Sequence, residues 1–252
     1  AMLTLLDELG VTYSLNPSVL KITPNGKKAT GIILEDGEEI RADLVVSNLE
    51  AIPTYKTLLK DIPMANRAAE DLEKFSPTVS GLVLLLGVNK KYDELAHHNF
   101  FFSEDPELEF HTIFNEGKPA LDPTIYIGVS SKTDTTQAPQ GKDNLFVLTH
   151  VPPLKEGESW DEYKDIYREK VLSKLERMGL EGLSSSIEFE YCFTPNDLMN
   201  LYGANGGSIY GVVTDRKKNG GFKIPCRSKL LDNLYFTGGS THPGGGVPMV
   251  TL

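Results

Sequence analysis

The chain has 252 residues, 40% of them hydrophobic, which is enough for one large domain or two small ones with their own cores. A formal net charge of −10 argues against a nucleic-acid partner, because phosphates attract clustered lysine and arginine. The longest apolar run, residues 81–88, is far shorter than the roughly 20 residues that a membrane-spanning helix needs. A short, continuously apolar run of this length is typical of a buried strand. Cys192 and Cys226 form no CxxC pair, and we expect two reduced thiols in a cytoplasmic protein.

The N-terminal part of the chain predicts short strands followed by helices. Strands are expected at residues 11–15, 19–22, 29–34 and 42–48, and helices at residues 3–9, 50–59 and 63–74. Asp36-Gly37 predicts a tight turn, because glycine and aspartate tolerate the positive φ angles of a hairpin. The centre of residues 42–48 is continuously apolar, which is typical of a strand buried on both faces.

The middle of the chain is rich in strand patterns. Strands are expected at residues 79–88, 124–129, 144–151 and 185–193, and helices at residues 160–178 and 195–202. Ser159 is expected to cap the longer helix, with Glu162 in the position of a capping box. The whole pattern predicts a mixed α/β (α+β) fold, with a strand-rich middle between two flanking pieces.

Two clusters of side chains leave alternatives open. Phe100, Phe101 and Phe102 could belong to the core, to a membrane-facing patch or to the wall of a substrate tunnel. His97 and His98 stand without another ligand at metal-site spacing, and adjacent side chains in a strand point to opposite faces, so no metal is expected. No Ser/His/Asp or Cys/His set stands at motif spacing, so the catalytic residues stay unassigned.

Residues 233–249 carry the most specific pattern: a short apolar strand, a glycine-rich loop and the start of a helix. Glycines let the backbone approach a ligand closely, and a helix N-terminus offers unpaired N–H groups and a partial positive charge. This combination suits a phosphate or an electron-rich carbonyl of a nucleotide-like cofactor. The alternative is a Gly-Pro turn that binds nothing.

The run NLYFTGGSTHPGGGVPMV resembles the C-terminal flavin-binding signature of bacterial phytoene and diapophytoene desaturases. Two more stretches resemble the same family in the same order. These are TPNDL at residues 194–198 with GGSIYG at residues 206–211, and LGV at residues 9–11 with DG at residues 36–37 and ADLVVSN at residues 42–48. The resemblance covers most of the chain and is weakest over residues 90–141.

The resemblance implies an amine-oxidase-like flavoprotein with an FAD domain and a substrate domain. Residues 2–52 would return to the FAD domain, residues 53–203 would form the substrate domain, and residues 204–252 would carry the C-terminal FAD segment. The family's N-terminal dinucleotide-binding unit is not in the sequence, so we expect a C-terminal fragment that binds FAD negligibly and is inactive by itself.

The resemblance also implies roles for single residues. Gly238 and Gly239 would approach the pyrophosphate and ribityl chain of FAD, and Ser240 stands where related amine oxidases carry an acidic residue. Val247, Pro248 and Met249 would open the helix that faces the flavin ring, and Val19 would contact the adenine. His242 would be a polar group near the flavin or the substrate, or else a loop residue that orients the turn.

The expected reaction is FAD-dependent desaturation of an acyclic C30 or C40 carotenoid such as phytoene or diapophytoene, with a quinone or oxygen as electron acceptor. Such a substrate implies a cytoplasmic enzyme that is peripheral at the inner face of the membrane, with contact near Phe100. Relatives with similar signatures isomerise carotenes, oxidise terminal groups or reduce retinol. A further alternative is a non-catalytic module that binds an apolar ligand or a membrane.

Overall fold

The computed structural model describes residues 2–15, 17–246 and 249, and the chain forms two compact units. The first comprises residues 1–72 and 225–237, and the second comprises residues 73–224 and 238–252. These units divide the chain at different residues from the predicted segments 2–52, 53–203 and 204–252, which stay a prediction. The predicted mixed class of helices and strands is confirmed.

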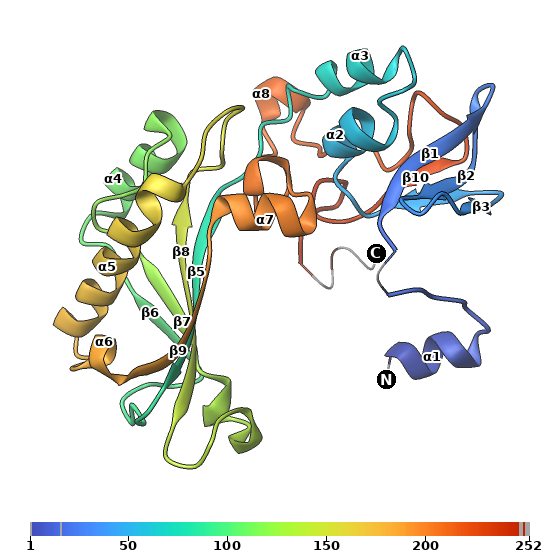
Figure 1. The fold of residues 1–252 in the computed structure, drawn as a ribbon. Helices are drawn as coiled ribbons and strands as arrows, with labels where there is room; N and C mark the ends of the chain where they lie inside the picture. Colours follow the sequence, from blue (N-terminus) through green and yellow to red (C-terminus); the bar gives the residue numbers. More distant parts are fainter. Residues whose placement is uncertain (1, 16, 247–248, 250–252) are drawn as a thin grey trace. The chain divides into compact units, whose positions relative to one another are not determined.

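The first unit holds two small sheets and three short helices (Figure 1). Its elements are α1 (Met2–Glu8), β1 (Val19–Asn25), β2 (Lys28–Leu34), β3 (Glu39–Arg41), β4 (Val45–Ser47), α2 (Ala51–Pro53), the π-helical turn η1 (Thr54–Leu58), α3 (Ala65–Glu70) and β10 (Leu234–Phe236). Strands β1, β2 and β3 form an antiparallel sheet, and β4 pairs in parallel with β10, with Val45 opposite Leu234. Tyr55 ties the helices to the returning C-terminal segment, since its hydroxyl lies 2.8 Å from Ser228 Oγ.

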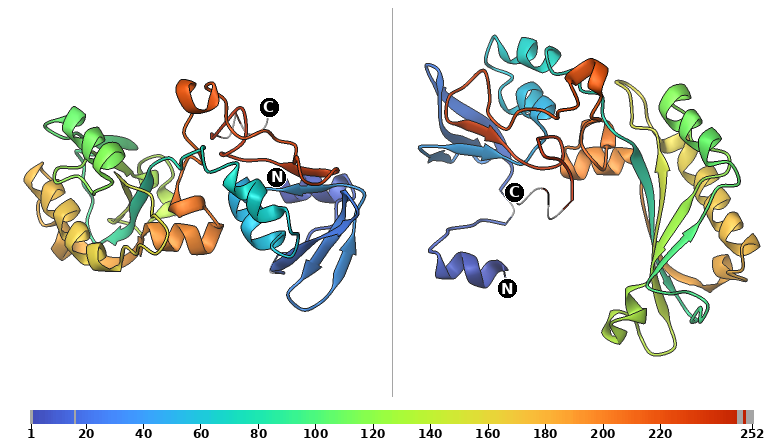
Figure 2. Two further views of the ribbon diagram at one scale, coloured as in Figure 1. Left: turned by 90° about the horizontal axis from the view of Figure 1, so that it is seen from above. Right: turned by 180° about the vertical axis from the view of Figure 1, so that it is seen from behind.

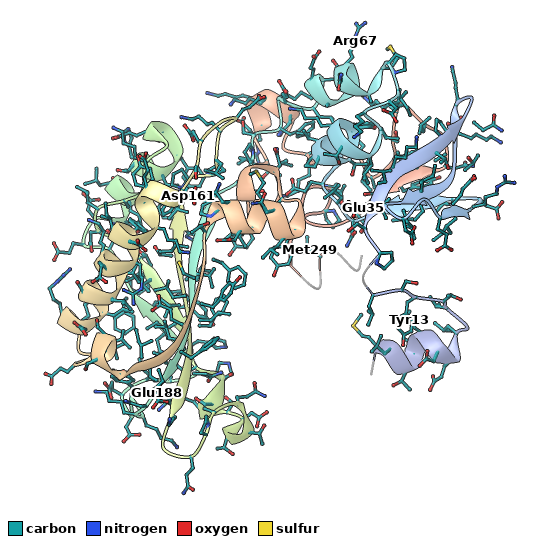
Figure 3. All side chains as sticks on the ribbon, viewed as in Figure 1. Tyr13, Glu35, Arg67, Asp161, Glu188 and Met249 are labelled. Atoms are coloured by element: carbon teal, nitrogen blue, oxygen red, sulfur yellow. The ribbon has the colours of Figure 1, made fainter. Side chains whose placement is uncertain are left out.

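Two expectations for this unit are wrong. Residues 11–15 form no strand: their backbone pairs with no other strand, and Leu15 is 72% exposed (Figure 3 shows the neighbouring Tyr13). Residues 42–48 form only the three-residue strand β4, and Val46 is 56% exposed. Apolar sequence predicts burial only where a second layer covers the strand, and the exposure of Val46 shows that its side chain is left largely open to solvent.

The second unit is built on a five-stranded antiparallel sheet with helices against one face (Figures 1 and 2). The strand order is β6-β7-β8-β5-β9. The elements of this unit are β5 (Ser80–Val88), β6 (His98–Phe101), α4 (Pro106–His111), the π-helical turn η2 (Thr112–Glu116), β7 (Ile125–Gly128), the 3-10 turns η3 (Ser130–Lys132) and η4 (Thr135–Gln137), β8 (Asp143–Val151), α5 (Asp161–Arg177), α6 (Leu183–Ser186), β9 (Ile187–Phe193), α7 (Pro195–Tyr202), the 3-10 turn η5 (Asn205–Gly207) and α8 (Arg216–Asn219).

The core of this unit lies between the sheet and α5. The buried residues of the two layers are Leu82, Leu84, Leu86, Ile125, Ile127, Leu145 and Val147 from the strands, and Tyr167, Val171, Leu172 and Leu175 from α5. The amphipathic pattern of residues 160–178 therefore predicts α5 correctly. The capping box predicted at Ser159 is wrong, because Trp160 is the N-cap and Ser159 Oγ donates to Asp161. Instead, Thr194 and Asp197 form a capping box at the start of α7.

A buried lysine joins α5 to the segment before β7. Lys174 Nζ donates to Asp122 Oδ1 at 2.6 Å and to the carbonyls of Phe102 and Pro123 at 2.8 and 2.9 Å. Burial by itself would raise the pKa of Asp122, but hydrogen bonds from Lys174 and the Glu104 N–H, together with the Lys174 charge, lower it below its ordinary value. The clamp therefore satisfies every donor of the buried ammonium group.

We expect Lys174→Met to lower the free energy of unfolding by about 2 kcal/mol, because it leaves a carboxylate and two carbonyls without their donor. The carboxyl has a depressed folded pKa, so its contribution is present above the unfolded pKa and is lost as the pH falls through the folded value. Urea unfolding at neutral and acidic pH measures both effects. Lys170→Met on the same helix is the control, and an equal loss in the two variants would contradict the clamp.

Candidate functional site

The glycine-rich loop of residues 238–246 is held by close backbone packing inside the second unit. Gly211 lies against it, and a Cβ atom on Gly211 would stand 2.5 Å from both the Gly239 carbonyl carbon and the Ser240 nitrogen. Gly211 has a φ angle of +71°, which side-chain-bearing residues rarely adopt. The Ser240 carbonyl accepts from the Ile224 N–H, and the His242 N–H donates to the Ile224 carbonyl. The loop is thus fixed from two sides without side chains on its glycines.

The loop leaves backbone donors available. Within the described part of the chain, the N–H groups of Gly239, Gly244 and Gly245 donate to no protein acceptor. Gly244 and Gly246 have φ angles of +128° and +106°, so the backbone turns in a way that favours glycine. Unpaired N–H groups beside glycines suit phosphate oxygens, which accept several hydrogen bonds. The residues present fit the pyrophosphate of a dinucleotide.

The structure places the other residues predicted to bind the cofactor or substrate in different surroundings. Ser240 is buried and His242 is exposed, with its ring 5.7 Å from that of Phe222. Met249 is 40% exposed and donates its N–H to the Gly246 carbonyl at 2.9 Å, while Val247 and Pro248 lie outside the described residues. Val19 begins β1 in the first unit. The boundary between the units falls inside the signature, between Thr237 and Gly238.

The sheet face opposite α5 carries a second group of apolar side chains, which the sequence analysis did not assign. Directly opposed residues share a face, so the pairing register places them in rows. One row is Phe100, Tyr126, Leu148, Val83 and Phe193, and the next is His98, Gly128, Phe146, Leu85 and Tyr191. We call this surface, with Phe189 one step along β9, the aromatic face.

The aromatic face is open along much of its width. Phe100, Phe146, Phe189 and Tyr191 are 58%, 41%, 62% and 47% exposed. Its rings contact one another, with centroids 5.3 Å apart for Phe100 and Tyr126 and 4.5 Å apart for Tyr191 and Phe193. An exposed apolar surface made of several aromatic side chains is typical of a binding site.

Glycines make room for these rings. A Cβ atom at Gly128 would stand 2.8 Å from the Tyr126 hydroxyl, and one at Gly81 would stand 2.8 Å from a methyl group of Leu148. Each glycine removes a side chain where a large neighbour lies down on the sheet. The two glycines therefore let Tyr126 and Leu148 lie along the sheet, which extends the apolar surface between neighbouring strands.

Two histidine side chains, those of His98 and His150, lie at opposite ends of the aromatic face. His98 Nδ1 lies 2.8 Å from the Tyr126 hydroxyl at the β6 edge. His150, opposite Gly81, has a buried Nε2 atom without a hydrogen-bond partner in the described chain, and burial lowers the pKa of this imidazole although Glu109 opposes the effect. The His150 ring is accordingly neutral at physiological pH. Sequence alone could have suggested this face, because β5 and β8 are apolar on both of their faces.

The structure separates the three phenylalanines of residues 100–102. Phe101 packs against the core on the α5 side, whereas Phe100 lies on the aromatic face and Phe102 is 64% exposed. Strand alternation causes this split, since neighbouring side chains of β6 point to opposite faces. The membrane contact expected near Phe100 stays a prediction, and Phe100 and Phe102, whose rings stack with centroids 5.9 Å apart, are the two exposed side chains of the three.

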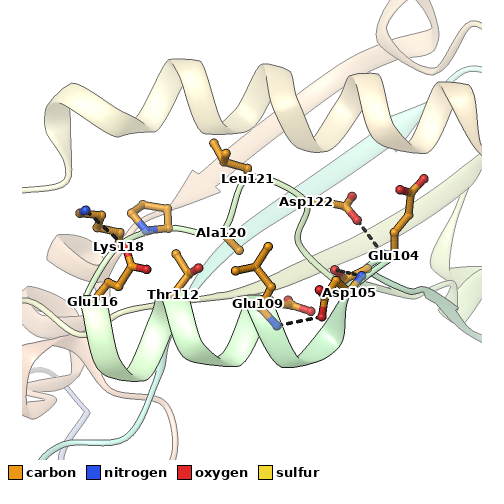
Figure 4. Close-up of a pocket in the computed structure, with 12 residues that line it drawn as sticks. Glu104, Asp105, Glu109, Thr112, Glu116, Lys118, Ala120, Leu121 and Asp122 are labelled. Atoms are coloured by element: carbon orange, nitrogen blue, oxygen red, sulfur yellow. Dashed lines mark hydrogen bonds and ion pairs between the residues drawn. The ribbon is translucent and has the colours of Figure 1, made fainter.

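A pocket of about 550 Å³ lies beside α4, with both apolar and acidic residues in its lining (Figure 4). Its acidic lining residues are Glu104, Asp105, Glu109, Glu116 and Asp122, and several of their carboxylates already have partners. Glu109 is buried and accepts from the Thr124 N–H and hydroxyl at 2.7 Å, and Asp105 caps α4 through the Leu108 N–H. These acids hold the local structure together. No group of three or more His, Cys, Asp or Glu side chains in the described residues could hold a metal ion.

Curated relatives match the chain over its whole length. It is 47% identical over 246 residues to the 4,4'-diaponeurosporene oxygenase of Staphylococcus haemolyticus, covering 97% of this chain and 48% of that protein. It is 45% identical over 253 residues to the protein of the same name from Staphylococcus aureus strain MSSA476, covering 100% and 50%. The chain thus spans about half the length of these relatives. No protein-family model matches it.

A solved structure shares the arrangement of elements. An oxidoreductase from Methanosarcina mazei superposes with a TM-score of 0.63 at 17% sequence identity, covering 100% of this chain and 51% of that one. The chain has the fold of this oxidoreductase. Within the described residues, no helix combines the length and apolar character needed to span a bilayer. Both cysteines are free thiols in the structure, as the sequence predicts, and burial raises the pKa of Cys192 to about 11.

Proposed function

We propose that the whole protein is an FAD-dependent oxidoreductase that acts on an acyclic carotenoid. The aromatic face is the observation that carries this proposal. A polyene offers no hydrogen bonds, so it is held by burying apolar area, and the rows through Phe146 and Tyr126 provide a long apolar surface. The relatives, at 45–47% identity, are named for a carotenoid, which supplies the substrate class.

FAD supplies a two-electron acceptor when it is bound. The chain's own contribution is to donate backbone N–H groups from Gly239, Gly244 and Gly245 to the phosphates. Gly211 keeps this loop in place. The aromatic face orients the polyene and excludes water from it. The assignments of Gly238, Gly239, Ser240, His242, Val247, Pro248, Met249 and Val19 to the cofactor or substrate remain part of this proposal.

We favour oxygenation of the carotenoid over its desaturation. The relatives are named oxygenases, and oxygenation is one of the alternatives that the signature leaves open. In this reaction two C–H bonds of a terminal methyl group are replaced by a C=O bond. One atom of dioxygen enters the product and the other leaves as water, so that the four electrons lost by the carbon are those that dioxygen takes up. Desaturation, with a quinone or oxygen as acceptor, is the second candidate, because residues 233–250 resemble the signature of the desaturases.

Product analysis tests the proposal. The whole protein is incubated with FAD and either 4,4'-diaponeurosporene or phytoene in liposomes under isotope-labelled dioxygen. We expect flavin absorbance in the purified protein and a product that has gained a labelled oxygen atom. An unlabelled product that has lost hydrogen and absorbs at longer wavelength would establish desaturation instead. A whole protein that releases no flavin on denaturation would overturn the proposal in favour of a non-catalytic module.

A further inference from the structure

A second cavity opens at the end of the sheet where β5 begins and β8 ends. It has a volume of about 370 Å³. Its apolar lining residues include Pro77, Ile113, Phe114, Pro152, Leu154 and Val213. None of these residues belongs to the aromatic face or to the glycine loop. The cavity is therefore a separate feature from the proposed substrate and cofactor sites.

Lysines gather around this cavity. Lys74, Lys155 and Lys218 line it, and all three are exposed. The one lining carboxylate is Asp215, and its Oδ1 accepts the N–H groups of Lys217 and Lys218 at the start of α8. Lys155 lies 3.7 Å from Glu158, in an exposed pair of little strength. A locally basic rim on a chain of net charge −10 is complementary to an anionic surface.

Two exposed phenylalanines stand next to the lysines. The rings of Phe110 and Phe114 stack with centroids 5.9 Å apart, and the side chains are 50% and 54% exposed. Phe114 lines the basic cavity and also a neighbouring hollow, whose lining includes Phe110, His111 and one acidic residue, Glu107. Exposed aromatic rings beside lysines are the pattern of a surface that lies in a membrane interface.

We propose that this surface docks on a bilayer that contains anionic phospholipids. Lys74, Lys155 and Lys218 bind the headgroup phosphates at the cavity rim, and Phe110 with Phe114 enters the interface beside them. This inference rests on the proposed function, because a carotenoid dissolves in the acyl region of a bilayer and the enzyme must reach it there. An acidic protein partner could form ion pairs with the lysines. Unlike a bilayer, however, it offers no apolar region into which the two exposed phenylalanine rings could insert.

Vesicle co-sedimentation of the whole protein tests the surface. We expect binding to phosphatidylcholine vesicles that contain phosphatidylglycerol and much weaker binding to phosphatidylcholine alone. Lys74→Gln, Lys155→Gln and Lys218→Gln should each weaken binding about fivefold, so that the triple variant binds on the order of 100-fold more weakly. Phe110→Ser should weaken it about fivefold on the anionic vesicles, and Phe114→Ser should do the same.

Matched controls separate these effects from general charge and exposure. Lys27→Gln, Lys60→Gln and Lys91→Gln together remove the same charge from exposed positions elsewhere, and Tyr202→Ser removes an aromatic ring that is 66% exposed. Both controls should bind as the wild type does. Equal binding of the triple lysine variant and its control would overturn the proposal. Absence of vesicle binding, with a dimer in gel filtration that the Phe110 and Phe114 variants dissociate, would also overturn it and make the surface an interface between copies.

Activity on two forms of the substrate distinguishes this proposal from the proposed function. The docking variants should lose turnover of carotenoid embedded in anionic vesicles and keep turnover of carotenoid dispersed in detergent. An equal loss on both forms would contradict a docking role. A wild type that binds vesicles through these residues but turns over neither form would support the docking surface and refute the proposed reaction.

Discussion

Replacing Gly211 by alanine is expected to lower the free energy of unfolding by about 3 kcal/mol, one of the largest effects in the chain. Two costs add up. The positive φ angle of +71° strains any residue with a Cβ atom by about 1 kcal/mol, and overpacking costs a further 1–3 kcal/mol. The added methyl group would stand 2.5–2.6 Å from backbone atoms of Gly239 and Ser240, which cannot rotate away.

Gly141→Ala is the matched control for this measurement. Gly141 has a similar φ angle of +82°, and a Cβ atom there meets no atom within 4 Å. The Gly141→Ala substitution should therefore lower the free energy of unfolding only by the cost of backbone strain, about 1 kcal/mol. Urea unfolding followed by circular dichroism compares the two variants. Because the Gly211 variant pushes the glycine loop away, we also expect the whole protein to release flavin more readily, and equal stability of the two variants would show that the close packing is absent.

Phe146→Asp is expected to reduce the kcat/KM for carotenoid by about 100-fold while the protein stays folded. Phe146 lies at the centre of the aromatic face and is 41% exposed, so the carboxylate remains in contact with water in the free protein. Binding a polyene over it would desolvate the charge, and a cost of about 3 kcal/mol corresponds to the 100-fold loss. Phe146→Leu keeps the surface apolar and should retain most of the activity.

The neighbouring substitution Val147→Asp should have the opposite outcome. Val147 is 1% exposed in the core under α5, so a carboxylate there has no solvent and no partner. We expect this variant to fail to fold, which circular dichroism and gel filtration would show. A Phe146→Asp variant that turns over carotenoid like the wild type would exclude the aromatic face as the substrate site.

The two candidate reactions, oxygenation and desaturation, would use the same surface, the aromatic face, to bind the substrate. Oxygenation and desaturation both require an extended apolar platform, and both are compatible with the rows of side chains on β5, β8 and β9. As proposed, the two reactions would differ in which carbon of the polyene reaches the flavin and in whether an oxygen atom enters the product. Placement of the substrate decides this, and side chains such as His98 and His150 at the ends of the face are the polar groups available to influence it.

The mixed class, the long strands β5 and β8, the helix α5 and the glycine-rich signature could all be predicted from the amino-acid sequence. These features depend on local periodicity and on glycine, whose effects are confined to a few neighbouring residues. Sequence also placed the chain near carotenoid enzymes, and the relatives named for a carotenoid agree. The predicted strands at residues 11–15 and 42–48 are wrong, because burial of a strand depends on a second layer of structure that packs on it, and the local sequence pattern carries no information about that layer.

Which face of the sheet forms the core and which is exposed became clear from the folded chain. Antiparallel strands that are apolar on both sides look alike in sequence, and Phe100 and Phe101 are indistinguishable until the register assigns them to opposite faces. The same holds for Gly211, whose importance comes from a loop nearly thirty residues away. The lysine rim likewise joins Lys74, Lys155 and Lys218 from distant segments, because folding brings together residues that no sequence window contains.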